Sequence, residues 1–181
     1  MSAQLITTIT NTGTTVLEVI QFDSVWTIYD SNGLVIATGG YVEAIGPRLL
    51  APGETGYVAA SEFTGDYKKS DFDHAEIDVY FDESNGSAYA LTTENTRTRR
   101  NSSGDIEVTG EIRNDGTERV DSAEVLAVFL AADGTPLGFA DGLFDNVEAG
   151  QTRAFQISTT FADIAFSDIA DTKIFASDDS F

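Results

Sequence analysis

The fold of this protein is decided by residues 25–33, which read VWTIYDSNG. The first five are β-branched or aromatic residues, which favour strands, and the last four are typical of a tight turn. Asn-Gly accepts the positive φ angles that two-residue hairpin loops require. A second run of this kind, AVFLAADG at residues 127–134, ends in Asp-Gly. The two runs predict two similar strand-and-turn units in one chain.

The repeat continues on both sides of these runs. A β-prone stretch ends in Asn-x-Gly at residues 11–13 and again at 114–116. A later turn reads APGET at residues 51–55 and EAGQT at 148–152, and a strand-like segment follows each copy. The copies lie about 100 residues apart, a spacing that fits two small domains of one fold.

Both halves are predicted to be all-β sandwiches of the immunoglobulin-like, fibronectin-III-like class. Strand-like runs alternate with Gly, Asn and Asp turns, and no long amphipathic helix pattern occurs. Residues 61–75 and 159–170 are expected to form loops, each with a short helical turn. A polar stretch at residues 94–104 marks the boundary. We therefore expect a first domain over residues 1–95 and a second over 96–181.

Charge is the strongest feature of the composition. The 181 residues include 30 Asp and Glu against 10 Lys and Arg, a formal net charge of -20. Phosphate backbones and anionic membrane surfaces attract cationic proteins, so both are poor partners for this chain and nucleic acid is not expected to bind it. Such acidity keeps a protein soluble, and it is typical of high-salt adaptation, since the Debye length falls to about 3 Å at 1 M salt. A calcium-rich extracellular setting is the competing interpretation.

The sequence also limits the chemistry and the location. It has no cysteine, which excludes disulfides, Cys-ligated metal sites and thiol nucleophiles. No apolar run approaches the roughly 20 residues that span a bilayer, so direct membrane insertion is not expected. The first residues do not resemble a secretory leader. The protein is therefore either cytoplasmic or exported with a signal that lies outside this numbering.

Residues 26–30, WTIYD, resemble the signature of the FxLYD domain family: an aromatic residue, any residue, an aliphatic residue, Tyr and Asp. Trp26 takes the Phe position, Ile28 takes the Leu position, and Tyr29 and Asp30 match in type. The resemblance implies a prokaryotic extracellular or surface-anchored protein with an immunoglobulin-like fold and no established catalytic activity.

The motif is interpreted as structural. Alternate residues of the strand are expected to face the core, and Asp30 is expected to cap the turn. The second half holds a degenerate copy, VFLAA at residues 128–132, in which Leu130 fits the aliphatic position and the Asp is shifted by one residue.

Catalysis has one possible imidazole base, His74, which lies among acidic residues. A Ser-His-Asp site needs a histidine base held by a carboxylate. No nucleophile motif surrounds His74, so we expect an exposed loop histidine and no enzyme.

Calcium is the one cofactor that the sequence leaves open. It takes about six to eight oxygen ligands, and Asp/Asn/Gly clusters supply them. The candidate ligands are Asp82, Glu83, Asp141 and Asp145. None of the clusters follows EF-hand spacing, and the alternative is that these residues are solvated turn formers.

A basic run, RTRR at residues 97–100, interrupts the acidic sequence. One interpretation is a linker, or an edge strand of the second module whose charges block further pairing. The other is a contact with an acidic face in the same chain or in a neighbouring subunit.

These features predict a non-enzymatic extracellular or cell-surface module for adhesion, spacing or protein binding, with a protein partner or self-association. One alternative is a self-assembling structural subunit in which an edge strand accepts a donor such as residues 174–181. The other is a carbohydrate-binding module, with exposed aromatic side chains on a flat platform: Tyr41, Tyr57, Tyr67 and Tyr89.

Overall fold

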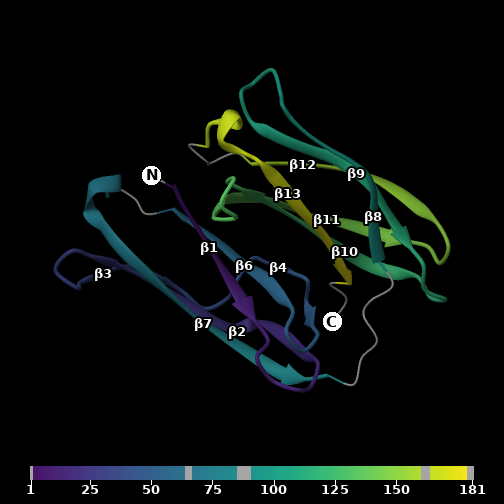
Figure 1. Cartoon of the computed structure of the whole chain (residues 1–181), viewed down its shortest axis with the longest axis horizontal. Coiled ribbons are helices and arrows are strands. Elements are labelled where there is room, and N and C mark those ends of the chain that lie inside the picture. Colours follow the sequence, from purple (N-terminus) through teal and green to yellow (C-terminus); the bar gives the residue numbers. More distant parts are fainter. Residues whose placement is uncertain (1, 64–66, 85–90, 160–163, 179–181) are drawn as a thin grey trace. The chain divides into compact units, whose positions relative to one another are not determined.

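The computed structural model describes residues 2–63, 67–84, 91–159 and 164–178. The chain divides into two compact units, Met1–Asn85 and Gly86–Phe181, called unit 1 and unit 2 below. Regular structure in the described residues is entirely strand, apart from two 3-10 turns, η1 (Lys69–Asp71) and η2 (Phe166–Asp168) (Figure 1). The all-β class and the two short helical turns predicted from the sequence are confirmed.

Unit 1 is a sandwich of two antiparallel sheets. Its strands are β1 (Ser2–Thr10), β2 (Leu17–Asp30), β3 (Val35–Gly39), β4 (Ala44–Gly46), β5 (Leu49–Leu50), β6 (Thr55–Phe63) and β7 (Phe72–Glu83). One sheet has the order β1-β6-β4. In the other, β2 lies between β7 on one side and β3 and β5 on the other. Their inward side chains form one core, including Val19, Trp26 and Ile28 from β2 and Val58 and Ala60 from β6.

Unit 2 is a second sandwich. Its strands are β8 (Leu91–Arg100), β9 (Ile106–Asn114), β10 (Val120–Leu130), β11 (Pro136–Val147), β12 (Thr152–Thr159) and β13 (Asp171–Asp178). The sheets have the orders β12-β9-β8 and β11-β10-β13. Val108 and Ile112 from β9 pack with Val125, Phe129 and Phe155 in the core between them.

The two units share one arrangement of paired strands, which is called the frame below. Strand β1 pairs with β6 as β9 pairs with β12, and β2 lies between β3 and β7 as β10 lies between β11 and β13. The register is equivalent as well, because Thr10 faces Thr55 in unit 1 and Arg113 faces Thr152 in unit 2. The sequence repeat is therefore a structural repeat of tandem immunoglobulin-like sandwiches.

A buried asparagine fixes one corner of the frame in unit 1. Asn11, 2% exposed, donates from Nδ2 to the carbonyls of Thr15 and Leu50 at 2.8 and 2.9 Å. Its Oδ1 accepts the N–H of Gly13 at 2.9 Å. One side chain thus joins the end of β1 to the following turn and to β5.

The same bonds recur in unit 2. Asn114, 1% exposed, donates to the carbonyls of Glu118 and Val147 at 2.8 and 2.9 Å, and its Oδ1 accepts the N–H of Gly116 at 2.9 Å. The Asn-x-Gly repeat therefore marks a buried polar bracket as well as a turn.

The division between the units lies earlier than the sequence predicted. The units divide at Asn85 and Gly86, whereas the expected boundary at residues 95 and 96 lies inside β8. Strand β8 pairs with β9 and lies at an edge of the sheet in unit 2. The polar, Arg-bearing segment is thus an edge strand and not a linker.

The units differ in where the sheet that contains the shared strand pair, β1-β6 or β9-β12, is extended. In unit 1 the added strand is β4, which pairs with β6. In unit 2 it is β8, which pairs with β9, the counterpart of β1. The two sheets are therefore extended at opposite edges of the shared strand pair.

Candidate interaction surface

The strand that decides the fold places its alternate residues in the core, as predicted. Trp26 and Ile28 are 3% and 2% exposed. The indole Nε1 of Trp26 donates to the carbonyl of Tyr41 at 3.1 Å. Gly39 lies opposite Trp26 on β3, where an added Cβ would stand 2.3 Å from the indole ring. Only glycine at this position leaves room for the indole.

Asp30 ends β2 and caps its hairpin. Its Oδ1 accepts the N–H groups of Asn32 and Leu34, each at 2.8 Å. These bonds, led by the one from Leu34, hold the pKa of Asp30 below its ordinary value. Gly33 supplies the positive φ of the turn, at 78°. The predicted turn cap is confirmed.

The second copy of the motif aligns one residue away from the sequence prediction. The hairpin of unit 2 closes at Ala131, whose carbonyl accepts the N–H of Gly134 at 3.0 Å, as Asp30 closes the hairpin of unit 1. Leu130 is therefore the counterpart of Tyr29 and not of the aliphatic position. The shifted Asp, Asp133, lies within the turn and caps it from there, because its Oδ1 accepts the N–H of Thr135 at 3.0 Å.

Tyr29 lies on the side of β2 that faces away from the core. We call this side of strands β3, β2 and β7 the outer face of unit 1. Apolar groups stand on it in contact with solvent, since Val25, Val35 and Tyr80 are 38%, 55% and 58% exposed. The strand registers place the following side chains on this face: Val25, Thr27, Tyr29, Val35, Thr38, His74, Glu76, Asp78 and Tyr80.

An aromatic stack orders one end of the outer face. The rings of Tyr29 and His74 lie 4.8 Å apart between centroids, with an interplanar angle of 16°. Tyr29 Oη donates to Glu76 Oε2 at 3.2 Å, and this bond to a carboxylate raises the pKa of Tyr29. The imidazole Nδ1 lies 2.8 Å from Asp73 Oδ2.

A bulge in β2 adds a second aromatic pair. The pairing with β7 slips after Ile20, and Ser24 bridges the gap: its Oγ donates to the Ile20 carbonyl at 2.7 Å and accepts the Tyr80 N–H at 3.2 Å. Phe22, in the bulge, is 57% exposed, and its ring centroid lies 6.5 Å from that of Tyr41. The bulge therefore turns a phenyl ring towards solvent.

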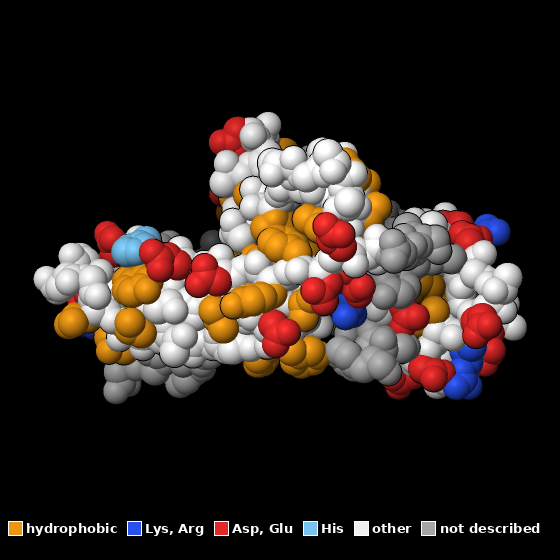
Figure 2. All heavy atoms as spheres, turned by 90° about the horizontal axis from the view of Figure 1, so that it is seen from below, with side chains coloured by type: hydrophobic (Ala, Val, Ile, Leu, Met, Phe, Trp, Pro, Cys, Tyr) orange, Lys and Arg blue, Asp and Glu red, His pale blue; other side chains and the backbone are white. Residues whose placement is uncertain are grey.

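Figure 2 shows hydrophobic and acidic side chains intermixed on the surface, with the histidine in pale blue among them. Isolated exposed apolar residues are normal, but several exposed apolar side chains grouped on one sheet face are typical of an interaction site. The outer face of unit 1 is therefore the candidate functional site of the described chain.

His74 is exposed, as predicted, but it lies on β7 and not in a loop. Its ring is stacked on Tyr29, and its Nδ1 faces Asp73 on an open sheet surface. An exposed sheet face gives no enclosure in which a general base is shielded from water.

The predicted calcium ligands do not converge. Asp82 and Glu83 are consecutive residues of β7 and so point to opposite faces of the sheet. Asp141 and Asp145 share a face of β11 but are separated by about 13 Å of strand. In the described ranges, no group of three Asp, Glu or His side chains is arranged to hold a metal ion.

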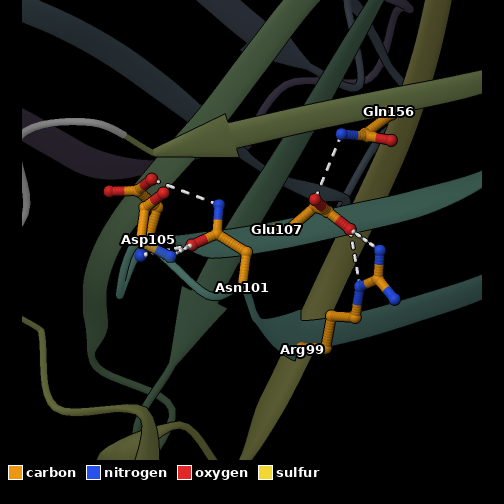
Figure 3. Close-up of polar contacts among 6 residues, drawn as sticks. Arg99, Asn101, Asp105, Glu107 and Gln156 are labelled. Atoms are coloured by element: carbon orange, nitrogen blue, oxygen red, sulfur yellow. Dashed lines mark hydrogen bonds and ion pairs between the residues drawn. The ribbon is translucent and has the colours of Figure 1, made fainter.

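The basic run is engaged within unit 2 (Figure 3). Arg99 donates from Nε to Glu107 Oε1 at 2.6 Å, and Gln156 donates to Glu107 Oε2 at 3.1 Å. Glu107 is only 5% exposed. Arg100 Nε donates to the Gly104 carbonyl at 2.9 Å. Two arginines of the run thus hold the edge strand to its own unit.

The segment considered as a strand donor already belongs to unit 2. Residues 171–178 form β13 and pair with β10 along its length, with Phe175 opposite Leu126. The prediction of a free donor is therefore wrong for these residues. The rest of the proposed donor, 179–181, lies outside the described residues.

The four tyrosines of the carbohydrate hypothesis do not share one sheet. Tyr57 lies on β6 of the smaller sheet, whereas the ring of Tyr41 lies near Phe22 at the bulge of the larger one. Tyr67 precedes η1. Tyr89 lies outside the described residues.

Fold and surface together define a tandem β-sandwich protein with an exposed aromatic sheet face. No protein-family model matches the chain, and no characterised protein matches it in sequence. Within the described chain, no helix is long and apolar enough to cross a membrane.

The solved structures that resemble the chain include β-glucuronidases. A calcium-binding mutant of Bacteroides uniformis β-glucuronidase 2 is 15% identical, with a TM-score of 0.27, over 88% of this chain and 22% of that chain. Bacteroides uniformis β-glucuronidase is 18% identical, with the same TM-score, over 87% and 21%. The chain spans about a fifth of the length of these enzymes. Similarity at this level carries no functional argument.

Sequence reasoning missed the residues that shape the candidate surface. Phe22 lies in a bulge that breaks the alternation of β2, so no period-2 pattern assigns it to the solvent face. Ser24, which is fully buried, is the signal that was available: a small hydroxyl residue between apolar runs is suited to bridging a bulge.

Proposed function

We propose that this chain is a non-enzymatic protein-binding module that works outside the cell, as part of a surface or secreted protein. The observation that carries the proposal is the outer face of unit 1, where aromatic and aliphatic groups stand in contact with solvent on one face of a sheet. Aromatic residues dominate the buried centres of protein interfaces.

The mixture of groups on this face fits a protein partner. Val25, Val35 and Tyr80 supply apolar area, while Glu76 and Asp78 stand between them. Such a face complements a partner with apolar contacts and cationic side chains around them. The net charge of -20 favours the same class of partner.

The extracellular location and the FxLYD resemblance are part of this proposal. Two features support the family resemblance: the burial of Trp26 and Ile28, and the Asp30 cap, which are the roles that a structural motif requires. Absence of catalysis is proposed because His74, the one imidazole, is stacked on an open surface.

The experiment measures binding of the labelled chain to intact cells, and to the secreted proteins, of the organism that encodes it. Tyr80→Asp combined with Val35→Asp is expected to reduce binding at least tenfold, because both add charge to the outer face. Leu143→Asp is the matched control, since Leu143 is 62% exposed on β11 of unit 2. Protease treatment of the cells is expected to abolish binding. Equal binding by all variants would overturn the proposal.

A further inference from the structure

Unit 2 has a cleft at one side of its sandwich, where an edge strand of one sheet lies next to an edge strand of the other. Strand β8 ends one sheet and β13 ends the other, and the Thr98 hydroxyl donates to that of Thr172 at 3.1 Å. The cleft has a volume of about 320 Å³ and is lined by residues of β8, of η2 with the turn that follows it, and of β13. Ligand pockets have volumes of about 300–1,000 Å³, so this cleft suits one small ring rather than a long chain.

An aromatic ring forms part of the lining. Phe166 of η2 lines the cleft and is 38% exposed, whereas Ile164 and Ile169, which flank it in the sequence, pack against the core of unit 2. The Ala170 N–H donates to the Leu130 carbonyl at 2.8 Å and so joins the end of this turn to β10. The fold thus fixes the turn and leaves its largest side chain in contact with solvent at the cleft.

Threonine hydroxyls supply a polar part of the lining, from Thr96, Thr98 and Thr172. Strand β8 has a bulge at Thr96, because its register with β9 shifts between Glu94 and Arg97. Bulges re-aim side chains and are frequent beside functional sites. The bond between the other two hydroxyls uses the hydrogen of Thr98, so the Thr172 hydroxyl can donate its own hydrogen to a ligand.

Among the described residues that line the cleft, Asp171 alone carries a charge. Its Oδ1 accepts the N–H of Thr172 at 2.8 Å, and its Oδ2 lies 2.9 Å from Lys173 Nζ. These contacts, led by the one with Lys173, lower the pKa of Asp171, so the group is ionised at neutral pH. A carboxylate accepts about four hydrogen bonds, which leaves Asp171 able to accept further bonds from a ligand.

The charges around the cleft favour a neutral ligand. The Lys173 ammonium offsets the Asp171 carboxylate, so a cationic ligand gains little there. An anionic ligand is repelled, because Asp171 lies in the lining and the chain carries a formal charge of -20. A ligand that suits the cleft therefore has groups that form hydrogen bonds, an apolar face and no net charge.

We propose that this cleft binds one neutral sugar ring. The ring carbons of a sugar present an apolar face of C–H groups, which suits the exposed ring of Phe166. The hydroxyl groups around that ring both donate and accept, which suits the Asp171 carboxylate and the threonine hydroxyls. The inference concerns unit 2 and is independent of the binding function proposed for the outer face of unit 1.

Titration of the isotope-labelled full chain, followed by NMR of its backbone amides, tests the site. The probes are the methyl glycosides of glucose, galactose, mannose and N-acetylglucosamine. At least one is expected to bind with a Kd on the order of 1 mM, as the size of such a ligand implies. The shifted amides are expected to lie in residues 96–98 and 166–174. The proposal is overturned if none of the four shifts these amides at concentrations far above that Kd.

Two variants test the lining groups. Phe166→Ala removes the ring, and Asp171→Asn removes the charge but keeps an oxygen for the Thr172 N–H. Each is expected to weaken binding of the sugar about tenfold. Asp168→Asn and Leu143→Ala are the matched controls, since Asp168 lies in η2 outside the cleft lining and Leu143 is 62% exposed on β11. Far-UV circular dichroism verifies that each variant is folded. Unchanged binding by both cleft variants would contradict the proposal.

The methyl glycoside of glucuronic acid tests the preference for a neutral ring. It is expected to bind the wild type more weakly than the best neutral glycoside, because its carboxylate meets that of Asp171. The difference is expected to narrow in Asp171→Asn, which lacks the repelling charge. A glucuronide that binds the wild type more tightly than all four neutral glycosides would show that the proposed ligand class is wrong.

Discussion

Unit 1 and unit 2 are built on one frame and finished differently. In both, a strand ends in a buried asparagine and pairs with the strand that follows a glycine turn. Unit 2 closes the outer edge of that pair with β8, whereas unit 1 adds β4 on the opposite side. The arrangement of the central strands is thus the same in both units, whereas the edge strands differ.

The two units also differ in charge at the edge that β8 covers in unit 2. Glu107 of β9 is buried and forms an ion pair with Arg99 of β8, whereas its counterpart on β1 is the neutral Gln4. A buried carboxylate without a partner is costly, and for Glu107 the covering strand supplies the cation. The buried carboxylate of Glu107 and the strand that covers it, β8, therefore occur together in unit 2.

The largest effect is expected from the feature that the units share. Asn11→Ala leaves the Thr15 and Leu50 carbonyls and the Gly13 N–H without partners. Each lost buried partner costs about 1–3 kcal/mol, so unit 1 is expected to lose about 3–4 kcal/mol of unfolding free energy. Trp26, the one tryptophan, reports unit 1 alone. Its fluorescence follows the loss in urea.

Asn114→Ala is the companion to this variant. It is expected to leave the Trp26 transition in place while far-UV circular dichroism shows an equal loss for unit 2. If Asn114→Ala shifted the Trp26 transition as much as Asn11→Ala does, the two units would not unfold independently.

A smaller loss of stability is expected at a place where the units differ, the contact between Gly39 and Trp26, the first residue of the WTIYD motif. Gly39→Ala sets a Cβ against the Trp26 ring, and overpacking of this kind costs about 2–3 kcal/mol. Gly40→Ala is the control, because nothing lies within 4 Å of its added Cβ. In unit 2 the same cross-strand pair is Ala127 and Ala140. Similar urea midpoints for the two variants would show that Trp26 adapts.

The covering strand of unit 2 is tested at its ion pair. Arg99→Met removes the cation from Glu107, and because Arg99 is half exposed the expected loss is about 1–2 kcal/mol. Adding Glu107→Gln, which copies the neutral residue of β1, is expected to restore most of the stability measured by circular dichroism. Failure of this rescue would mean that the packing of Arg99, rather than its charge, holds β8.

Much of the frame was predictable from the sequence, because its determinants are local. The Asn-Gly turn, the burial of Trp26 and the cap by Asp30 follow from turn chemistry and period-2 alternation. The edges were not predictable, since whether β8 covers β9 depends on pairing between segments and not on the composition of either one.

The candidate surface could not be predicted from the sequence, for a related reason. The bulge at Ser24 shifts the alternation of β2, and the hydrophobic pattern of the sequence alone does not reveal one inserted residue. The one-residue error in aligning Leu130 has the same origin: apolar residues fill both neighbouring positions, and only the hairpin hydrogen bonds fix the register.

The smallest effect is expected from acid, at the turn carboxylate of the first hairpin, Asp30. The pKa of Asp30 is lowered by the N–H bonds it accepts, so its carboxylate stabilises unit 1 above the pKa it has when unfolded, about 3.9. That stabilisation disappears as the pH falls through the lower folded pKa. Asp30→Ala lacks it at every pH. The Trp26 transitions of wild type and variant are therefore expected to differ at pH 7 and to converge once the pH has fallen below the folded pKa of Asp30. In unit 2 the counterpart of Asp30 is Ala131, and the carboxylate that accepts a backbone N–H in the turn is Asp133, whose bond from Thr135 likewise lowers its pKa. A gap between wild type and variant that stays constant with pH would mean that the cap acts through shape and not through its charge.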